Sequence, residues 1–381
     1  MTNRGKSAPV ELIEKVDSKI EMVRTRSLDL SFNELLDMYQ SEELEIAPEY
    51  QRLFRWSEEK QSQFIESLIL EMPIPPIYVI ETEEGVYELI DGLQRISSYL
   101  HFRGALKDSD FLRLIDCDIV TELNGYTYDE LPKALQIKLK RNFIRVEVIR
   151  KGSDQRLRYY MFKRLNTGGE LLSEQELRNC TIRLLDERFN DFIIELSRNK
   201  DFKACMTHLS AQNFNLKIDQ EYVLKFFAFK NDREHYQKNI ASFVTSYMEG
   251  VSYSPGEEEH IPFDYQKEKA IFNKTFAVLH SSLGEYAFAR VNNHGNWVSS
   301  VSPTHFDAIT LGIQPYIEEL NAEDPRQMGH LNQLLKQIKQ NSDFLNATLG
   351  GGKNTRSYLE QRIKLVEERV GEWLRGSGKT S

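Results

Sequence analysis

The chain has 381 residues, of which 40% are hydrophobic and 28% are charged, and its formal net charge is −9. This length favours two domains, and the composition is that of a soluble globular protein. Proteins that coat nucleic acid or anionic membranes are usually basic. The acidic balance therefore excludes a general binder of polyanions and leaves only local basic patches for such contacts.

Three cysteines, Cys117, Cys180 and Cys205, are widely spaced and form no CxxC pair. This pattern is typical of a reducing cytoplasm and argues against a disulfide framework or a zinc ribbon. The first residues lack the apolar region of a signal peptide, and no apolar run approaches the roughly 18 residues that span a membrane. The sequence therefore predicts a cytoplasmic protein without a membrane segment.

The first part of the chain mixes helix and strand signals after a leader, residues 1–20, that is predicted to be flexible. Ser31 followed by Glu34 predicts a capped helix start, Ser57 predicts the next one, and Pro73 is expected to end that second helix. Further signals are the strands 77–81 and 86–90 with a turn at 82–85, a helix from Leu93, a strand at 143–150 and a helix at 154–165.

The second part reads as mainly helical. Ser173 with Glu176 predicts a capped helix, and strand signals fade from about residue 181. We expect a loop at 249–262, a tight turn at 292–296 and a last helix near 355–374, with Leu359, Ile363, Val366, Val370 and Trp373 on one stripe. The predicted division is a leader at 1–20, a mixed domain at 21–180, a helical domain at 181–375 and a flexible tail at 376–381.

One strand-to-helix turn combines Asp91, Gly92, Gln94 and Arg95. A helix N-terminus after a glycine presents backbone N–H groups and a positive dipole end, which favours an anion. Arg95 would hold a phosphate with two hydrogen bonds, Gln94 would orient a water or a base edge, and Asp91 would hold a metal ion or a ribose hydroxyl. The same residues also fit a structural interpretation, with Asp91 as N-cap and Arg95 as a solvated side chain.

The helix, proline turn, hairpin and helix around this turn resemble the core of the ParB and sulfiredoxin superfamily. More closely, the sequence resembles the N-terminal domain family of the GmrSD type IV restriction systems. Three motifs carry the resemblance: an Asp-Gly-x-Gln-Arg turn, an upstream Gln-Arg-x-x-x-Trp block and a downstream Phe-x-Arg-x-Asn-x-Gly block. They are matched by Asp91, Gly92, Gln94 and Arg95; by Gln51, Arg52, Arg55 and Trp56; and by Arg164, Asn166, Thr167, Gly168 and Gly169, followed by Glu176 and Arg178.

The resemblance implies an α+β fold: a ParB/sulfiredoxin-like small mixed sheet with helices, followed by a mainly α-helical domain. It also implies binding of a nucleoside triphosphate with Mg²⁺, and its hydrolysis or the nicking of DNA, in a phage-restriction system. The catalytic residues would be Asp91, Gln94 and Arg95, with Asp91 also a metal ligand. The phosphate-binding residues would be Gln51, Arg52, Arg55, Gly92, Arg95, Arg164, Asn166, Thr167, Gly168 and Gly169.

Several alternatives stay open at the level of sequence. Trp56 suits a nucleobase or core packing, and the NTGGE segment suits an anion nest or a plain turn. The basic residues between 138 and 164 form a nucleic-acid patch or a solvated face; they are Lys138, Lys140, Arg141, Arg145, Arg150, Lys151, Arg156, Arg158, Lys163 and Arg164. Many family systems include an HNH nuclease, and the segment around His260 lacks its full pattern. A separate nuclease is therefore an expected partner, an oligomer is left open, and the rival function is a non-catalytic module that binds DNA or a partner.

Overall fold

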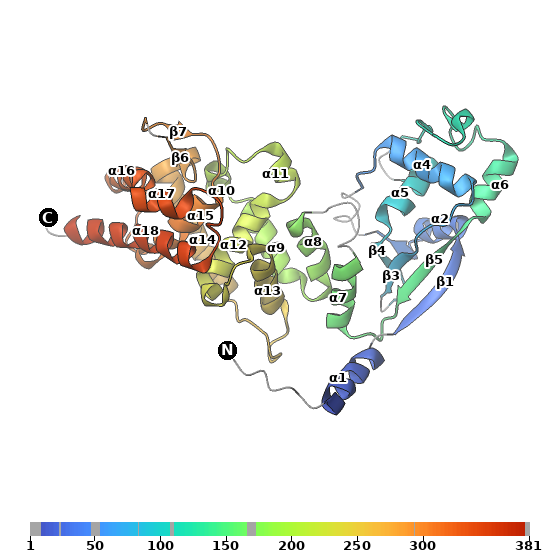
Figure 1. Ribbon diagram of the computed structural model, residues 1–381, viewed down its shortest axis with the longest axis horizontal. Coiled ribbons are helices and arrows are strands. Elements are labelled where there is room, and N and C mark those ends of the chain that lie inside the picture. The colour runs from blue at the N-terminus through green and yellow to red at the C-terminus, as the bar shows by residue number, and fades with distance from the viewer. Residues whose placement is uncertain are drawn as a thin grey trace. The chain divides into compact units, whose positions relative to one another are not determined.

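A computed structural model describes residues 9–22, 24–46, 54–82, 84–106, 110–165, 173–292 and 294–377. The chain forms two compact units, Met1–Leu171 (unit 1) and Leu172–Ser381 (unit 2). Unit 1 contains a mixed sheet with helices and unit 2 is mainly helical, so the predicted α+β class is confirmed (Figure 1). The boundary predicted near residue 180 lies inside unit 2, because residues 174–181 pack with the helical part of the chain.

Unit 1 holds α1 (Pro9–Glu21), α2 (Phe32–Gln40), α4 (Glu58–Ile69), α5 (Leu93–Phe102), α6 (Lys133–Arg141) and α7 (Gln155–Leu165). Its strands are β1 (Thr25–Ser31), β2 (Leu44–Glu45), β3 (Ile77–Glu81), β4 (Tyr87–Asp91) and β5 (Phe143–Ile149). They form one sheet in the order β1-β5-β3-β4-β2. β1–β5 and β3–β4 pair antiparallel, whereas β3–β5 and β2–β4 pair parallel.

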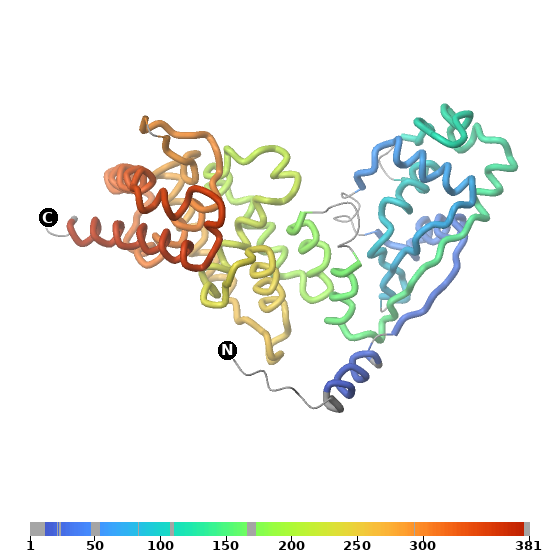
Figure 2. The backbone as a smooth tube through the Cα atoms, in the orientation of Figure 1, coloured from blue at the N-terminus to red at the C-terminus, as the bar shows by residue number. Residues whose placement is uncertain are grey.

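The sheet brings together segments that are distant in sequence. β1 runs beside β5 along its whole length, with Ser27 opposite Glu147 (Figure 2). Ile77, Val79, Val146 and Val148 are fully buried in register with one another and form the centre of the core. Residues 25–31 and 44–45 were not predicted as strands, because an edge strand with half-exposed side chains shows only a weak apolar alternation.

Helix starts follow the sequence prediction closely, whereas one helix end does not. The Ser31 Oγ accepts a hydrogen bond from the Glu34 N–H at 3.1 Å, and Ser57 is the N-cap of α4. The prediction that α4 runs to Pro73 is wrong: α4 ends at Ile69, and Glu71 adopts a left-handed φ of 56° that breaks the helix. Within the leader that was predicted to be flexible, Pro9–Glu21 form α1.

Unit 2 is built from helices, with one small hairpin. The longer helices are α8 (Glu174–Thr181), α9 (Glu187–Ser197), α12 (Ile218–Asp232), α13 (Ile240–Ser252), α14 (Tyr265–Leu283), α15 (Pro303–Gly312), α16 (Pro325–Gln340) and α18 (Arg356–Ser377). Shorter elements are α10 (Lys200–Cys205), α11 (Ala211–Asn215), α17 (Ser342–Thr348), β6 (Arg290–Val291) and β7 (Trp297–Val298). The hairpin β6–β7 flanks the predicted turn at 292–296.

Apolar packing holds unit 2 together. Four of the five predicted stripe residues of α18 are buried, and Trp373 is half-buried. Two boundaries differ from the prediction: α13 extends through Ser252 into the predicted loop 249–262, and α18 reaches Ser377 inside the predicted tail. α15 carries a fully buried His305, neither of whose ring nitrogens has a hydrogen-bond partner among the described residues. Burial lowers the pKa of His305 to about 3, with nearby cations adding to the shift.

Candidate functional site

The Asp91 turn begins with an irregularity in the sheet. Val79 of β3 pairs with Leu89, and the preceding residue, Tyr78, pairs with Asp91. Ile90 therefore has no opposite residue in β3 and is an extra residue in β4. Such a β-bulge re-aims the side chains that follow it. Asp91 is the last residue of β4, and its side chain remains 31% exposed.

Gly92 makes the turn into α5 sterically feasible. Its φ is 102°, in the left-handed region that residues with a Cβ avoid. A Cβ at this position would lie 2.3 Å from the Cγ2 atom of Ile77 on β3. The glycine therefore allows both the backbone conformation and the close approach of the helix start to the sheet.

The N-terminus of α5 has no side-chain cap. Gly92 is the N-cap residue, and its carbonyl accepts the hydrogen bond of the Ile96 N–H at 3.0 Å. The structural alternative in which Asp91 caps the helix is therefore wrong, because Asp91 belongs to the strand and its carboxylate points elsewhere. A helix start without a cap residue's side chain leaves room for an external acceptor at the positive dipole end.

Arg95 is anchored from both sides of the turn. One terminal nitrogen donates to the Pro75 carbonyl oxygen at 2.9 Å, and the other donates to the Asp91 Oδ2 at 2.9 Å. The arginine is only 14% exposed, so it is not the freely solvated side chain of the structural alternative. These two bonds use two of its five N–H donors and fix the plane of the guanidinium.

Gln94 connects the turn to the upstream motif. Its Oε1 accepts the backbone N–H groups of Arg55 and Trp56, each at 3.0 Å. The Trp56 carbonyl in turn accepts from the buried Gln61 Nε2 at 2.7 Å, and the indole lies 5.8 Å from Phe64 in an edge contact. The structure thus brings the Arg55–Trp56 segment next to the start of α5, with Trp56 partly in the core.

Of the other residues predicted to bind phosphate, the structure describes only Arg164. Arg164 lies in the last turn of α7, a helix that packs against β4. Gln51, Arg52, Asn166, Thr167, Gly168 and Gly169 lie outside the described residues. The residues that the structure brings together are therefore Arg55, Trp56, Asp91, Gly92, Gln94 and Arg95.

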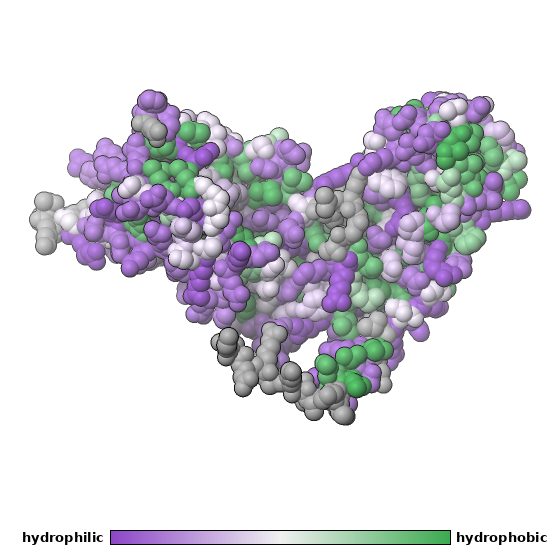
Figure 3. Space-filling model, in the orientation of Figure 1, coloured by the Kyte–Doolittle hydropathy of each residue, from purple (hydrophilic) through white to green (hydrophobic). Residues whose placement is uncertain are grey.

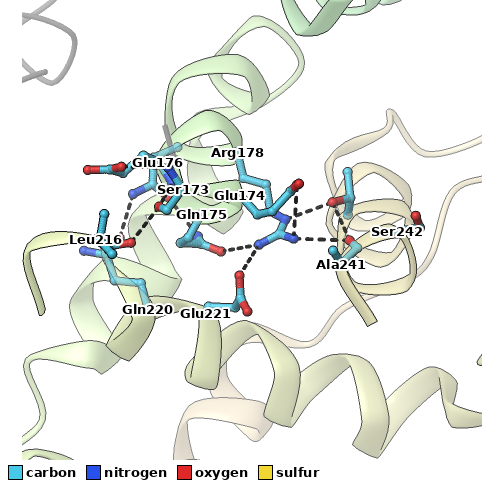
Figure 4. A network of polar contacts seen from close by, with 12 residues as sticks. Ser173, Glu174, Gln175, Glu176, Arg178, Leu216, Gln220, Glu221, Ala241 and Ser242 are labelled. Atoms are coloured by element: carbon cyan, nitrogen blue, oxygen red, sulfur yellow. Dashed lines mark hydrogen bonds and ion pairs between the residues drawn. The ribbon is translucent and has the colours of Figure 1, made fainter. Parts of the chain in front are cut away.

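The last part of the downstream motif belongs to unit 2. Ser173 and Glu176 form the predicted capping box, and the Ser173 Oγ also donates to the Leu216 carbonyl at 2.7 Å (Figure 4). Arg178 is 3% exposed and reaches α12 and α13. Its guanidinium donates to the side chains of Thr245, Gln175 and Glu221 and to the Ala241 carbonyl, at 2.9, 3.0, 2.9 and 3.2 Å.

This network explains Arg178 without a ligand. The carboxylate of Glu174 also lies near the guanidinium, at 3.9 Å. The side chain of Gln175 donates a hydrogen bond to Asn179, which in turn donates one to Gln220 on α12. Glu176 and Arg178 therefore have structural partners within unit 2. The sequence predicted a capped helix from Ser173, and both residues lie in it. This helix belongs to the helical unit, and that was the signal for their structural role.

Acidic neighbours neutralise part of the predicted basic patch. Arg145 pairs with Asp29 at 3.0 Å, which lowers the pKa of Asp29, and Lys138 pairs with Glu71 at 3.6 Å. Arg150 lies 3.7 Å from Glu81. The positive charge available to nucleic acid on this run is consequently smaller than the sequence suggests.

Metal and thiol chemistry find little support elsewhere. In the part of the chain that the structure describes, no three His, Cys, Asp or Glu side chains are grouped so that they could hold a metal ion. Cys117 and Cys205 are buried, and burial raises the pKa of both thiols, that of Cys117 to about 11, so neither is an activated nucleophile. Within the described ranges no helix is both long enough and apolar enough to traverse a bilayer.

Comparison with known proteins identifies the N-terminal region. Residues 32–183 match the model of the family described as GmrSD restriction endonuclease, N-terminal domain. The predicted likeness to the GmrSD N-terminal domain family is confirmed for this region. The match contains the Arg55–Trp56 segment, the Asp91 turn and α8, so the family segment crosses from unit 1 into unit 2. No curated protein and no solved structure matches the chain, so the likeness to the ParB and sulfiredoxin core stays a prediction.

Proposed function

We propose that this GmrSD N-terminal domain binds and hydrolyses a nucleoside triphosphate at the Asp91 turn, as a component of a restriction-type system. The observation that carries the proposal is the start of α5, where a glycine replaces a capping side chain beside a pre-oriented arginine. Backbone N–H groups at a helix N-terminus and a guanidinium are the two groups that proteins use most often to hold phosphate.

The described residues supply positioning and charge, which phosphoryl transfer chiefly needs. The guanidinium of Arg95, held by Pro75, would donate its remaining N–H groups to phosphate oxygens. Asp91 would orient the attacking water, whose oxygen forms a bond to the γ-phosphorus while the bond to the bridging oxygen breaks. Gln94 would act indirectly, because its Oε1 already holds the Arg55–Trp56 segment.

We also propose that Mg²⁺ binds at this turn, with one carboxylate, that of Asp91, as its protein ligand. Asp91 Oδ2 is paired with Arg95, and its Oδ1 has no partner among the described residues. Mg²⁺ in nucleotide sites is usually held by one or two carboxylates together with substrate phosphates and waters, and it neutralises charge on the phosphates. Asp91 would be the single protein ligand, and no larger carboxylate cage accompanies it in the described ranges.

The test uses Asp91→Asn in the full chain. Asparagine keeps the size of the side chain but removes the charge, so phosphate release at saturating nucleotide and Mg²⁺ should fall about 100-fold or more. Nucleotide binding should persist, since the change relieves repulsion between the carboxylate and the phosphates. Asp29→Asn is the matched control, because Asp29 is also paired with an arginine but lies on β1.

A second candidate is a module that grips phosphate of DNA or of an uncleaved nucleotide without turnover. The engagement of Asp91 and Gln94 in protein contacts favours it, because a residue held by protein is less free to take part in chemistry. Wild-type protein that releases no phosphate from any of the four nucleotides and does not nick supercoiled DNA, yet binds one of them, would select this candidate. Equal turnover by wild type and Asp91→Asn would remove Asp91 from the chemistry.

A further inference from the structure

The Arg55–Trp56 segment has no regular secondary structure to hold it. Residues 54–57 precede α4 and belong to no helix or strand. Arg55 is exposed, and so are Ser57 and the first three residues of α4, where Figure 3 shows a hydrophilic surface. Trp56 is only half-buried, with its edge contact to Phe64. Apolar burial alone therefore does not fix the backbone of Arg55.

Two glutamines hold both polar groups of the Trp56 backbone. The Gln94 Oε1 on α5 accepts from the Trp56 N–H at 3.0 Å, and the Gln61 Nε2 on α4 donates to the Trp56 carbonyl at 2.7 Å. Gln61 lies in the interior and is only 4% exposed. Burial of an amide is costly unless its polar atoms are hydrogen-bonded. The buried amide therefore keeps this bond, and its loss would leave the Trp56 carbonyl without this donor.

His101 fixes the direction of the Gln61 amide. Its Nδ1 lies 2.8 Å from the Gln61 Oε1. A carbonyl oxygen can only accept, so the Gln61 nitrogen faces Trp56 and its oxygen faces His101, which must donate through Nδ1–H. His101 follows Gln94 by about two helical turns, so both lie on the same face of α5. Helix α5 thus holds the segment directly through Gln94 and indirectly through His101 and Gln61.

We infer that Gln61 and His101 are positioning residues of the nucleotide site. Through the Trp56 peptide they hold Arg55 beside the start of α5, where its guanidinium would bind phosphate together with Arg95. Neither of the two touches the nucleotide. This inference rests on the proposed function, and it adds to it how the second arginine is kept in place. A purely structural role would lower stability without making the effect depend on Arg55.

The experiment is a double-mutant cycle on nucleotide affinity, measured by titration calorimetry with the full chain and whichever of the four nucleoside triphosphates the wild type binds. Gln61→Glu keeps the size of the side chain but places a carboxylate oxygen opposite the Trp56 carbonyl, so the dissociation constant should rise about 10-fold. Arg55→Ala should raise it about 10-fold or more. Because Gln61 acts through Arg55, the double variant should bind no more weakly than Arg55→Ala alone.

The pH dependence of affinity separates this role from a purely structural one. A protonated carboxyl group is again a hydrogen-bond donor, and burial favours that form. The affinity of Gln61→Glu should therefore approach that of the wild type as the pH is lowered from about 8 to about 5, whereas the ratio between Arg55→Ala and wild type should stay constant. His101→Asn keeps an N–H donor near the position of the ring nitrogen and should bind as the wild type does. His101→Leu lacks this donor and should bind about 3-fold more weakly.

Gln136→Glu is the matched control. Gln136 on α6 also donates to backbone carbonyls, those of residues 128, 129 and 131, so its change should lower stability in thermal unfolding without altering affinity. An equal loss of affinity in this control, additive effects of Gln61→Glu and Arg55→Ala, or an affinity of Gln61→Glu that does not recover at low pH would overturn the inference and leave the proposed function standing. A wild type that binds none of the four nucleotides would overturn the proposed function and this inference with it.

Discussion

Two arginines from the family motifs, Arg95 in unit 1 and Arg178 in unit 2, are held in opposite ways. Arg178 is almost fully buried and directs four hydrogen bonds to three side chains and a carbonyl of its own unit. Arg95 is partly exposed and makes two, one of them to a carboxylate that is itself exposed. An arginine with four of its five N–H donors used inside its own unit stabilises the fold, whereas one that is fixed in place by two bonds keeps donors for a ligand.

The largest effect expected from this comparison is on folding. Arg178→Ala would leave Glu221 and the polar groups of α12 and α13 without their partner, and should reduce the stability of unit 2 by about 3–5 kcal/mol. Arg183→Ala, at a partly exposed i,i+4 pair with Glu187 one turn later, should cost about 0.5 kcal/mol or less. Chemical denaturation followed by circular dichroism measures both, and similar losses would contradict the assigned role of Arg178.

The Asp91 turn depends on backbone geometry, so its weak point should be Gly92. Gly92→Ala combines an unfavourable φ with a clash against Ile77, and should destabilise unit 1 by about 2–4 kcal/mol. Gly85→Ala is the matched control, because Gly85 also has a positive φ but a Cβ there meets open space. Its cost should stay near 1–2 kcal/mol. Thermal unfolding that ranks the two variants equally would mean that the contact with Ile77 is relieved easily.

For ligand binding the ranking of the arginines should reverse. Arg95→Ala should weaken nucleotide binding by about 1.5–3 kcal/mol, the range for hydrogen bonds to charged groups, while changing stability much less than Arg178→Ala does. Arg145→Ala provides the control. Arg145 also pairs with an aspartate, at 3.0 Å, but the pair joins β5 to β1 and not the residues of the Asp91 turn. Titration calorimetry on folded protein decides the matter: unaltered affinity in Arg95→Ala would remove Arg95 from the site.

A smaller effect should appear in the pH dependence of stability, because unit 2 buries His305, whose charged form is disfavoured there. The pKa of His305 lies near 3 in the folded protein, whereas an unfolded histidine has its ordinary value near 6.5. Between these values the unfolded chain binds a proton that the folded chain does not, so stability falls as the pH falls. The loss should be about 1.4 kcal/mol per pH unit below 6.5. His305→Phe should flatten this dependence in urea titrations; an unchanged slope would show that other groups cause it.

Local features of the fold could be predicted from the sequence, and distant ones could not. The caps at Ser31 and Ser173 depend on groups within three residues, so their pattern is visible in the chain. The role of Gln94 depends on backbone groups 39 and 38 residues away, and no local pattern encodes it. β1 was missed because its partner β5 is more distant still along the chain, with Thr25 opposite Ile149.

The site was predicted from a series of motifs along the chain, and the end of the last motif, with Glu176 and Arg178, belongs to unit 2. Asp91 and Arg95 form the turn as expected, but the structural reason for Gly92 is the packing of Ile77 against it, a contact between β3 and the start of α5. Arg178 follows the NTGG segment in sequence, yet it serves the helical unit. Proximity along the chain is a poor guide to function where a motif spans the junction of two compact units.

The extra residue in β4 has a consequence for how this domain tolerates insertions and deletions. Removal of Ile90 would make Leu89 and Asp91 consecutive, so Val79 could pair with Leu89 and Tyr78 with Asp91 without a bulge. The bend and twist that the extra residue gives to β4 would be lost, and with them the direction in which Asp91 approaches the guanidinium of Arg95. Loss of a single residue from β4 should therefore be more damaging than most substitutions in the same strand, even though it removes no charged or polar group.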